Sequence, residues 1–151
     1  MDEQQLFRGE NFHGFHAGAK ESWNEYKAVR PEVPIPTRGK MFLRKYLQST
    51  GLEISLNVVG PGTGAPFLHR HKDNDEVYIV VGGRGQFVVD GKCIDVQEGS
   101  MLRVSPAAAR AYRNQFESPL YFICIQYRAD SVVTGGTQDG QLVEGEPAWR
   151  N

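Results

Sequence analysis

Residues 69–76 read His-Arg-His-Lys-Asp-Asn-Asp-Glu and hold the side chains best suited to chemistry. His69 and His71 are two positions apart, so on an extended strand both imidazoles point to one face and can converge on a single point. Glu76 follows a four-residue turn and opens the next expected strand, from which its carboxylate reaches the same point. Two neutral imidazoles and a carboxylate form a ligand set that binds Fe(II), Mn(II), Ni(II) or Zn(II) and leaves coordination positions open.

The competing interpretation is a solvated rim of a hairpin, because histidines are common on protein surfaces. The context favours the metal site. The histidine pair follows the Gly- and Pro-rich loop 60–66 and stands between apolar segments that read as strands. From the residues alone both interpretations stay open.

The elements that must position these residues are short β-strands. In residues 52–59 apolar and polar side chains alternate with a period of two, which predicts a strand with one apolar and one polar face. Asp90-Gly91 is a strong hairpin signal. Turn signals recur every 8–12 residues, as in all-β sandwiches and barrels. We expect about eight strands, at Met41–Gln48, Leu52–Val59, Glu76–Val81, Gln86–Val89, Cys93–Val96, Met101–Val104, Arg110–Asn114 and Leu120–Tyr127.

The flanking segments lack this rhythm. Residues 1–39 predict an irregular N-terminal arm, with one or two helical turns around residues 22–28, that lies over the barrel or over a neighbouring subunit. Residues 129–151 lose the alternation and predict a C-terminal tail. Residues 40–128 therefore form the barrel of a single domain, a size that the chain of 151 residues allows.

Composition excludes several classes of function. Seventeen basic and 18 acidic residues give a formal net charge of −1, which offers no electrostatic footprint for nucleic acid or for an anionic membrane. The N-terminus is polar and acidic, unlike a signal peptide, and the apolar runs fall far below the ~20 residues of a membrane span. Two cysteines are too few for a disulfide framework. We expect a cytoplasmic protein that binds a small molecule.

The spacing resembles the first motif of the cupin superfamily, which is Gly, five residues, His-x-His, four residues, Glu, six residues, Gly. His69, His71, Glu76 and Gly83 fit this spacing, and the leading glycine is displaced by one position. The resemblance covers roughly residues 40–128. It implies a double-stranded β-helix, the jelly-roll barrel, with one divalent metal ion on the two histidines and the glutamate. It also implies a homodimer.

The second motif of the superfamily is Gly, five residues, Pro-x-Gly, two residues, His, three residues, Asn. Gly99 and Asn114 lie at the right separation, whereas the proline is displaced to Pro106 and the second glycine is Ala107. Arg110 stands where the family usually has its fourth metal ligand. Arginine is permanently protonated and cannot ligate a metal.

Two arrangements of Arg110 are compatible with this substitution. Arg110 either pairs with Glu76 in a barrel without metal, or it binds an anionic substrate beside a metal that keeps three protein ligands and water. The second is favoured because the two histidines and Glu76 are retained together. A third route places Tyr112 or Asn114 at the position of the missing ligand.

The other two histidines of the chain, His13 and His16, lie in the N-terminal arm and are further candidates for a fourth ligand if the arm folds back onto the barrel.

Three further side chains are candidates for the pocket. Tyr78 shares the face of Glu76, so it either packs in the barrel or donates a hydrogen bond to Glu76 or substrate. Gln126 lies on a core-facing strand and needs polar partners there. Tyr112 is a third candidate for substrate binding. Cys124 is expected to be a small buried residue rather than a nucleophile.

Two functions stay open. The first is a metal-dependent enzyme of the dioxygenase, isomerase, lyase or decarboxylase type on a small organic substrate, for which Arg110 suggests an anionic or carboxylated group, since this fold hosts all of these reactions. The second is a non-catalytic module that binds a small ligand, with or without metal, and in which Arg110 pairs with Glu76. Open ligand positions favour the enzyme, and Arg110 favours the module. A purely structural dimer would leave the polar triad unexplained.

Overall fold

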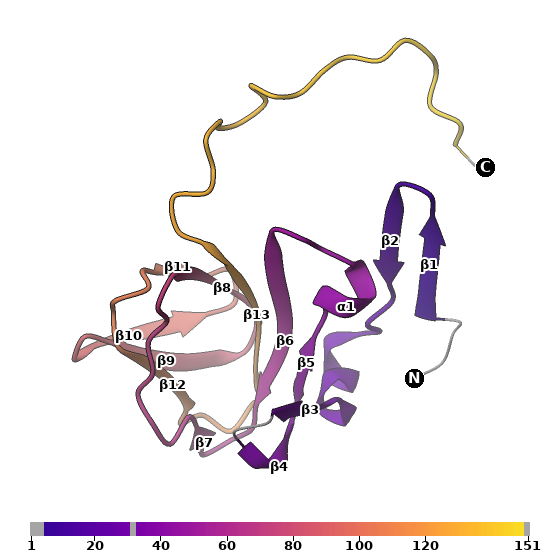
Figure 1. The fold of residues 1–151 in the computed structure, drawn as a ribbon. Coiled ribbons are helices and arrows are strands. Elements are labelled where there is room, and N and C mark those ends of the chain that lie inside the picture. Colours follow the sequence, from indigo (N-terminus) through magenta and orange to yellow (C-terminus); the bar gives the residue numbers. More distant parts are fainter. Residues whose placement is uncertain (1–4, 31–32, 150–151) are drawn as a thin grey trace.

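The computed structural model describes residues 5–30 and 33–149, so the ends of the expected arm and tail lie outside the described residues (Figure 1). Two antiparallel sheets form the barrel. The larger sheet has the order β11-β8-β13-β6-β5 and the smaller sheet the order β10-β9-β12-β7. Their strands are β5 Lys40–Phe42, β6 Leu52–Val59, β7 Thr63–Gly64, β8 Asn74–Gly82, β9 Arg84–Val89, β10 Lys92–Gln97, β11 Met101–Val104, β12 Arg110–Asn114 and β13 Leu120–Arg128. The predicted all-β barrel is confirmed.

The predicted strand at residues 41–48 is wrong in its second half. Strand β5 ends at Phe42, and Arg44–Leu47 form one helical turn, α1. Glu53 on β6 causes this change, because its Oε1 atom accepts hydrogen bonds from the backbone N–H groups of Leu43 (3.1 Å) and Arg44 (2.9 Å). Gln48 ends the turn in the left-handed conformation, with φ of 51°. The acceptor lies on a different strand, so the sequence around residues 43–48 does not by itself predict this helical turn.

The core of the barrel lies between the two sheets. Phe87, Leu120 and Phe122 are almost completely buried there, and their side chains come from both sheets. The rings of Phe87 and Phe122 meet nearly edge to face at 5.7 Å. The buried cluster consists of Val59, Tyr78, Val80, Phe87, Val96, Val104, Ala108, Leu120, Phe122 and Cys124.

A second core covers the outer face of the larger sheet. Trp23 from the N-terminal segment packs there with Met41, Leu43 and Leu56. The expected arm therefore does lie over the barrel, and it holds more regular structure than its sequence predicts. It contains two hairpins and a 3-10 helix, made of β1 Leu6–Gly9, β2 Phe12–Phe15, η2 Lys20–Glu25, β3 Lys27–Arg30 and β4 Val33–Arg38.

The second core changes how β6 is interpreted. The alternation in residues 52–59 predicts one apolar and one polar face, and a polar face would ordinarily meet water. Instead Ser55 and Asn57 on the polar face are 1% and 2% exposed and point into the barrel, together with Val59 of the inner core. The apolar face, with Leu56, lies under the N-terminal segment.

The C-terminal tail leaves β13 as an extended segment. Residues 129–149 form no helix or strand, and residues 130–149 are all exposed. Figure 1 shows this segment, in orange to yellow, standing away from the barrel. Within residues 5–30 and 33–149, no helix is long and apolar enough to cross a membrane.

The docking of the N-terminal segment leads to a stability prediction. Replacing Trp23 with alanine removes a large buried side chain from the second core, so we expect a loss of about 3–5 kcal/mol in the free energy of unfolding. The matched control is Phe12→Ala, whose side chain is exposed and whose loss should stay within about 0.5 kcal/mol. Urea unfolding measures both. Equal stabilities for the two variants would show that the segment does not pack on the sheet in solution.

Candidate metal centre

The two histidines lie on the loop between β7 and β8 rather than on a strand. Backbone hydrogen bonds nevertheless hold both residues against residues 106–110, where β12 begins. His69 exchanges two backbone hydrogen bonds with Arg110, at 3.0 and 2.9 Å, in an isolated β-bridge. The N–H of His71 donates to the carbonyl of Pro106 at 3.1 Å. These bonds hold both imidazoles on one side of the loop, as the spacing of the histidines predicts.

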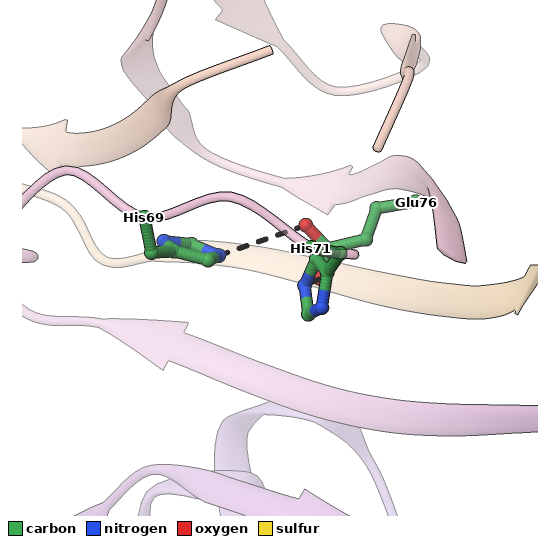
Figure 2. A group of neighbouring side chains, drawn as sticks. All are labelled: His69, His71 and Glu76. Carbon is green, nitrogen blue, oxygen red and sulfur yellow. Dashed lines mark ion pairs between the residues drawn. The ribbon is translucent and has the colours of Figure 1, made fainter. Parts of the chain in front are cut away.

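The structure brings the predicted triad together (Figure 2). His71 Nε2 lies 3.1 Å from Glu76 Oε1, and His69 Nε2 lies 3.7 Å from Glu76 Oε2. One ligand atom from each of the three residues lies within 4.8 Å of the others. The two imidazole rings are nearly perpendicular, with an interplanar angle of 87°. The triad is therefore a group that could hold a metal ion.

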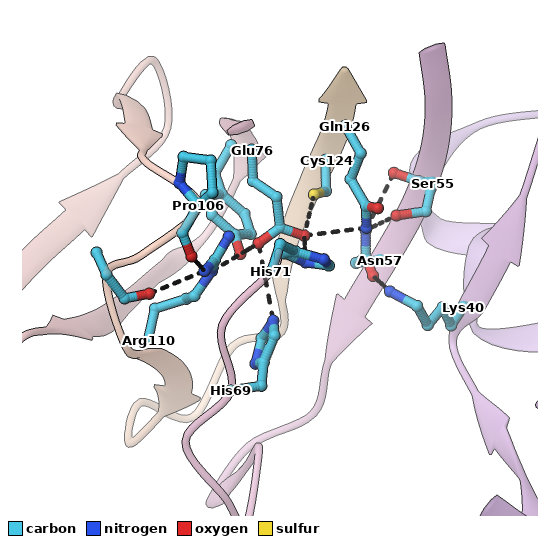
Figure 3. Close-up of polar contacts among 12 residues, drawn as sticks. Lys40, Ser55, Asn57, His69, His71, Glu76, Pro106, Arg110, Cys124 and Gln126 are labelled. Atoms are coloured by element: carbon cyan, nitrogen blue, oxygen red, sulfur yellow. Dashed lines mark hydrogen bonds and ion pairs between the residues drawn. The ribbon is translucent and has the colours of Figure 1, made fainter. Parts of the chain in front are cut away.

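The carboxylate of Glu76 is the centre of a larger polar network (Figure 3). Its Oε2 atom accepts hydrogen bonds from the Tyr78 hydroxyl and from Arg110 Nε, the latter at 2.9 Å. Its Oε1 atom accepts one from Gln126 Nε2 at 3.0 Å, and the Cys124 thiol lies 3.4 Å away. Tyr78 and Gln126, both candidates from the sequence, thus meet the site through Glu76.

Burial and charge set the protonation of this network. Burial alone would raise the pKa of Glu76, but the neighbouring His69, His71 and Tyr78 outweigh it and hold that pKa well below its usual range. Burial, followed by the charge of Glu76, raises the pKa values of Tyr78 and Cys124. At neutral pH Glu76 is therefore a carboxylate, while Tyr78 and Cys124 are neutral. A neutral thiol fits the expectation that Cys124 is a small buried residue.

Arg110 is fully buried and pairs with Glu76. Its Nη1 atom donates to the carbonyls of Ala108 (2.8 Å) and Pro106 (3.2 Å). Its Nη2 atom is also buried, and none of the described residues supplies an acceptor for it. The ion pair that the sequence analysis gives as one of two arrangements is therefore present, and one N–H₂ group of the guanidinium is left for another partner.

The remaining candidates for a fourth ligand have other positions. Asn114 is a structural residue, since its Nδ2 atom donates to the carbonyls of Val59 and Ser118 at 3.0 and 2.8 Å. Tyr112 packs its ring against Phe87 and Phe122 in the inner core. The prediction that Asn114 takes the place of the missing ligand is therefore wrong.

The two histidines of the arm lie in and beside the β1–β2 hairpin. His13 is part of β2 and pairs with Arg8 in its register, and the ring of His16 lies 4.8 Å from that of Phe7. The group of potential ligands that the structure brings together consists of His69, His71 and Glu76, and contains neither of these histidines.

The donors fit a divalent ion in type and separation. Bonds of about 2.0–2.2 Å to nitrogen and oxygen place neighbouring ligand atoms roughly 3.0–3.4 Å apart. The 3.1 Å between His71 and Glu76 lies in this range, and the 3.7 Å to His69 is slightly longer. His71 Nε2 is buried and makes no hydrogen bond, so its lone pair is available to an ion. The opposing factor is charge, because Arg110 already neutralises Glu76.

The sequence did not reveal a row of hydrogen-bonded polar side chains that lines the barrel wall next to the triad. Lys40 Nζ donates to Asn57 Oδ1 at 2.6 Å, and Asn57 Nδ2 donates to Ser55 Oγ at 3.0 Å. Ser55 lies opposite Cys124 in the register of β6 and β13. The signal that could have revealed it is the pair of polar residues in β6, whose burial depends on the second core.

Comparisons with known proteins agree with this geometry. A family model described as the cupin domain matches residues 56–126. The structure of a cupin protein from Bacteroides fragilis is 33% identical, covers 78% of this chain and 94% of its own, and superposes with a TM-score of 0.67. A Cupin 2 conserved barrel domain protein from Salinispora arenicola is 21% identical, with coverages of 60% and 75% and a TM-score of 0.54. An uncharacterised protein of Methanocaldococcus jannaschii is 25% identical over 68% of this chain and 83% of its own.

The structure is thus an all-β barrel with a His-His-Glu group that could hold a metal ion. The chain belongs to the cupin family.

The buried ion pair gives a prediction that needs no metal. In protein treated with EDTA, Arg110→Met leaves the Glu76 carboxylate buried without its counter-ion, so we expect a loss of about 3–5 kcal/mol in the free energy of unfolding. The double variant Glu76→Gln/Arg110→Met should lose less than the sum of the two single variants. Urea unfolding measures this cycle. The control is Arg113→Met, an exposed arginine. A loss for Arg110→Met no larger than the control's would contradict the pairing.

Proposed function

We propose that this cupin holds one divalent metal ion on His69, His71 and Glu76 and binds a small anionic organic molecule beside it. The observation that carries the proposal is the relation of His71 to Glu76. Their ligand atoms are 3.1 Å apart and buried, yet His71 Nε2 makes no hydrogen bond. A buried nitrogen without a partner is unfavourable, and a shared ion between the two atoms removes that cost.

Arg110 supports the anionic character of the ligand. Its Nε and Nη1 atoms are held by Glu76 and by backbone carbonyls, which fixes the plane of the guanidinium. The buried Nη2 group then has a set direction and lacks an acceptor among the described residues. A carboxylate or phosphate oxygen is the acceptor that a guanidinium binds best. Arg110 is thus both the partner of Glu76 and a donor to the ligand.

The other side chains of the site position Glu76 and add apolar surface beside the triad. A bound metal ion would act as a Lewis acid toward an oxygen atom of the ligand. The hydroxyl of Tyr78 and the amide of Gln126 hold the carboxylate of Glu76 from two sides. Phe67 and Leu68, which precede the histidines, are 51% and 60% exposed and offer apolar surface beside the triad. The reactions that suit such a site are those of a dioxygenase, an isomerase or a lyase.

The second candidate function is a metal-free barrel that binds a small ligand without turnover. The observation that favours it is the ion pair itself. Glu76 and Arg110 together are neutral, so a dication would bring its full charge into a buried site. In this arrangement His69 and His71 would serve as hydrogen-bonding groups for the ligand.

The expected homodimer, the cytoplasmic location and the absence of a nucleic-acid or membrane partner stay predictions from the sequence.

Elemental analysis of untagged protein, purified without chelator, decides between the two functions. We expect one divalent ion for each chain in the wild type and none in His69→Ala/Glu76→Ala, because the variant loses two of three ligands. His13→Ala/His16→Ala is the matched control and should keep its metal. Circular dichroism verifies that the variants fold. If the wild type stays free of metal after reconstitution with Fe(II), Mn(II), Ni(II) and Zn(II), the metal-free function replaces the proposal.

The charge of Arg110 should weaken metal binding. A unit charge about 4–8 Å from a divalent ion, at an effective dielectric constant of about 20, costs on the order of 4–8 kcal/mol. Arg110→His removes this repulsion at neutral pH and adds a ligand, so we expect the Kd for Zn(II) to fall by at least about tenfold. Competition with a chelating dye measures it. Arg110→Lys keeps the charge and should show no such gain. Equal affinities for the His and Lys variants would contradict this account.

A further inference from the structure

A groove of about 830 Å³ lies on the outer side of the barrel, among α1, β3 and β5. Its volume is in the range of ligand-binding sites in proteins. None of the triad residues lines it. The lining residues are Gln5, Glu25, Tyr26, Lys27, Ala28, Val29, Met41, Phe42, Arg44, Lys45, Tyr46, Gln48, Ser49 and Glu53.

The charged residues that line the groove are Lys27, Arg44 and Lys45 against Glu25 and Glu53, which gives it a net charge of +1. Lys27, Arg44 and Lys45 line it, and within the described residues none of the three forms an ion pair. The two acidic residues of the groove are engaged elsewhere. Glu25 lies 3.9 Å from Arg38, and the Oε1 atom of Glu53 accepts the two backbone hydrogen bonds of α1. The apolar floor between the cations includes Tyr26, Met41 and Tyr46. The groove therefore suits a segment that is both acidic and apolar.

The C-terminal tail has this composition. Residues 129–149 contain four acidic residues and no lysine, arginine or histidine. Within residues 142–149, which read Leu-Val-Glu-Gly-Glu-Pro-Ala-Trp, Glu144 and Glu146 stand between large apolar side chains. These apolar side chains are almost fully exposed, with Val143 at 89% and Trp149 at 85%. Exposed apolar surface of this extent marks a segment that gains from burial.

The tail also starts beside the groove. At the end of β13, Gln126 lies opposite Glu53 and Tyr127 opposite Leu52 in the register with β6. Glu53, with the nearby Gln48 and Ser49, lines the groove. The residues between Arg128 and Leu142 span at most about 45 Å when extended and about 20 Å on average as a flexible chain. In Figure 1 residues 129–149 of the tail arch away from the barrel and make no contact with the groove.

From these observations we propose that residues 142–149 bind in the groove of their own chain. Leu142, Val143 and Trp149 lie on the apolar floor, while Glu144 and Glu146 face the three cations. The short linker keeps the segment at a high effective concentration near the groove, so modest contacts are enough to hold it. The tail is then a strap that covers the junction of α1, β3 and β5.

Fluorescence of Trp149 in the full-length protein tests the proposal. The spectrum of the wild type minus that of Trp149→Phe isolates Trp149 from the buried Trp23. We expect emission shifted to the blue, and an acrylamide quenching slope at least about threefold lower than that of a free peptide of residues 141–151. The slope should rise toward the peptide's value in Arg44→Glu/Lys45→Glu and at high salt.

Arg84→Glu/Lys92→Glu reverses two exposed charges on the smaller sheet and is the matched control, which should keep the low slope. A wild-type slope equal to that of the peptide would overturn the proposal. A low slope that survives Arg44→Glu/Lys45→Glu would overturn this groove as the binding site. A slope that rises on about 100-fold dilution would overturn the same-chain arrangement, because it would show exchange of tails between copies.

Discussion

The barrel is organised around one buried negative charge. Glu76 is 3% exposed, and an isolated carboxylate at that depth would be strongly unfavourable. It is kept charged by donors that come from different parts of the chain: Arg110 from β12, Tyr78 from β8, Gln126 from β13, and the histidine loop. Arg110 and Gln126 are 34 and 50 residues from Glu76 in the sequence, so the full set of donors assembles only when β8, β12 and β13 come together. The contacts that stabilise the Glu76 carboxylate therefore also hold β8, β12 and β13 together.

Both faces of the larger sheet are covered by other parts of the protein. Its inner face carries the charge of Glu76 and the polar line of Ser55, Asn57 and Lys40, and its outer face is sealed by Trp23 and its neighbours. A half-buried sheet would place polar side chains of this kind in water. Here the N-terminal segment takes over the apolar side of β6. Because the apolar side of β6 is covered in this way, its polar side can face the interior of the barrel and add polar surface beside the triad.

Much of the fold follows from local pattern, because strand alternation and turn residues act over a few neighbours. The bounds of β6, β11 and β12 agree with those read from the sequence, and the spacing of His69, His71 and Glu76 correctly groups them. What local pattern does not show are contacts between distant segments. The turn α1 depends on Glu53, and the face that β6 turns inward depends on Trp23.

The contacts of Arg110 also could not be predicted from the local sequence. Its sequence position shows that it cannot be a metal ligand, but its partners, the carboxylate of Glu76 and the carbonyls of Pro106 and Ala108, appear only in the folded chain.

The carbonyl of Pro106 joins two parts of the site that the motifs treat as separate. It accepts hydrogen bonds from the backbone N–H of His71 at 3.1 Å and from Arg110 Nη1 at 3.2 Å. Arg110 therefore stabilises the loop that carries His71, one of the candidate metal ligands. A histidine at position 110 would add a ligand but remove this contact to Pro106, so residues 105–109 would lose the hydrogen bond that Arg110 Nη1 now makes to them.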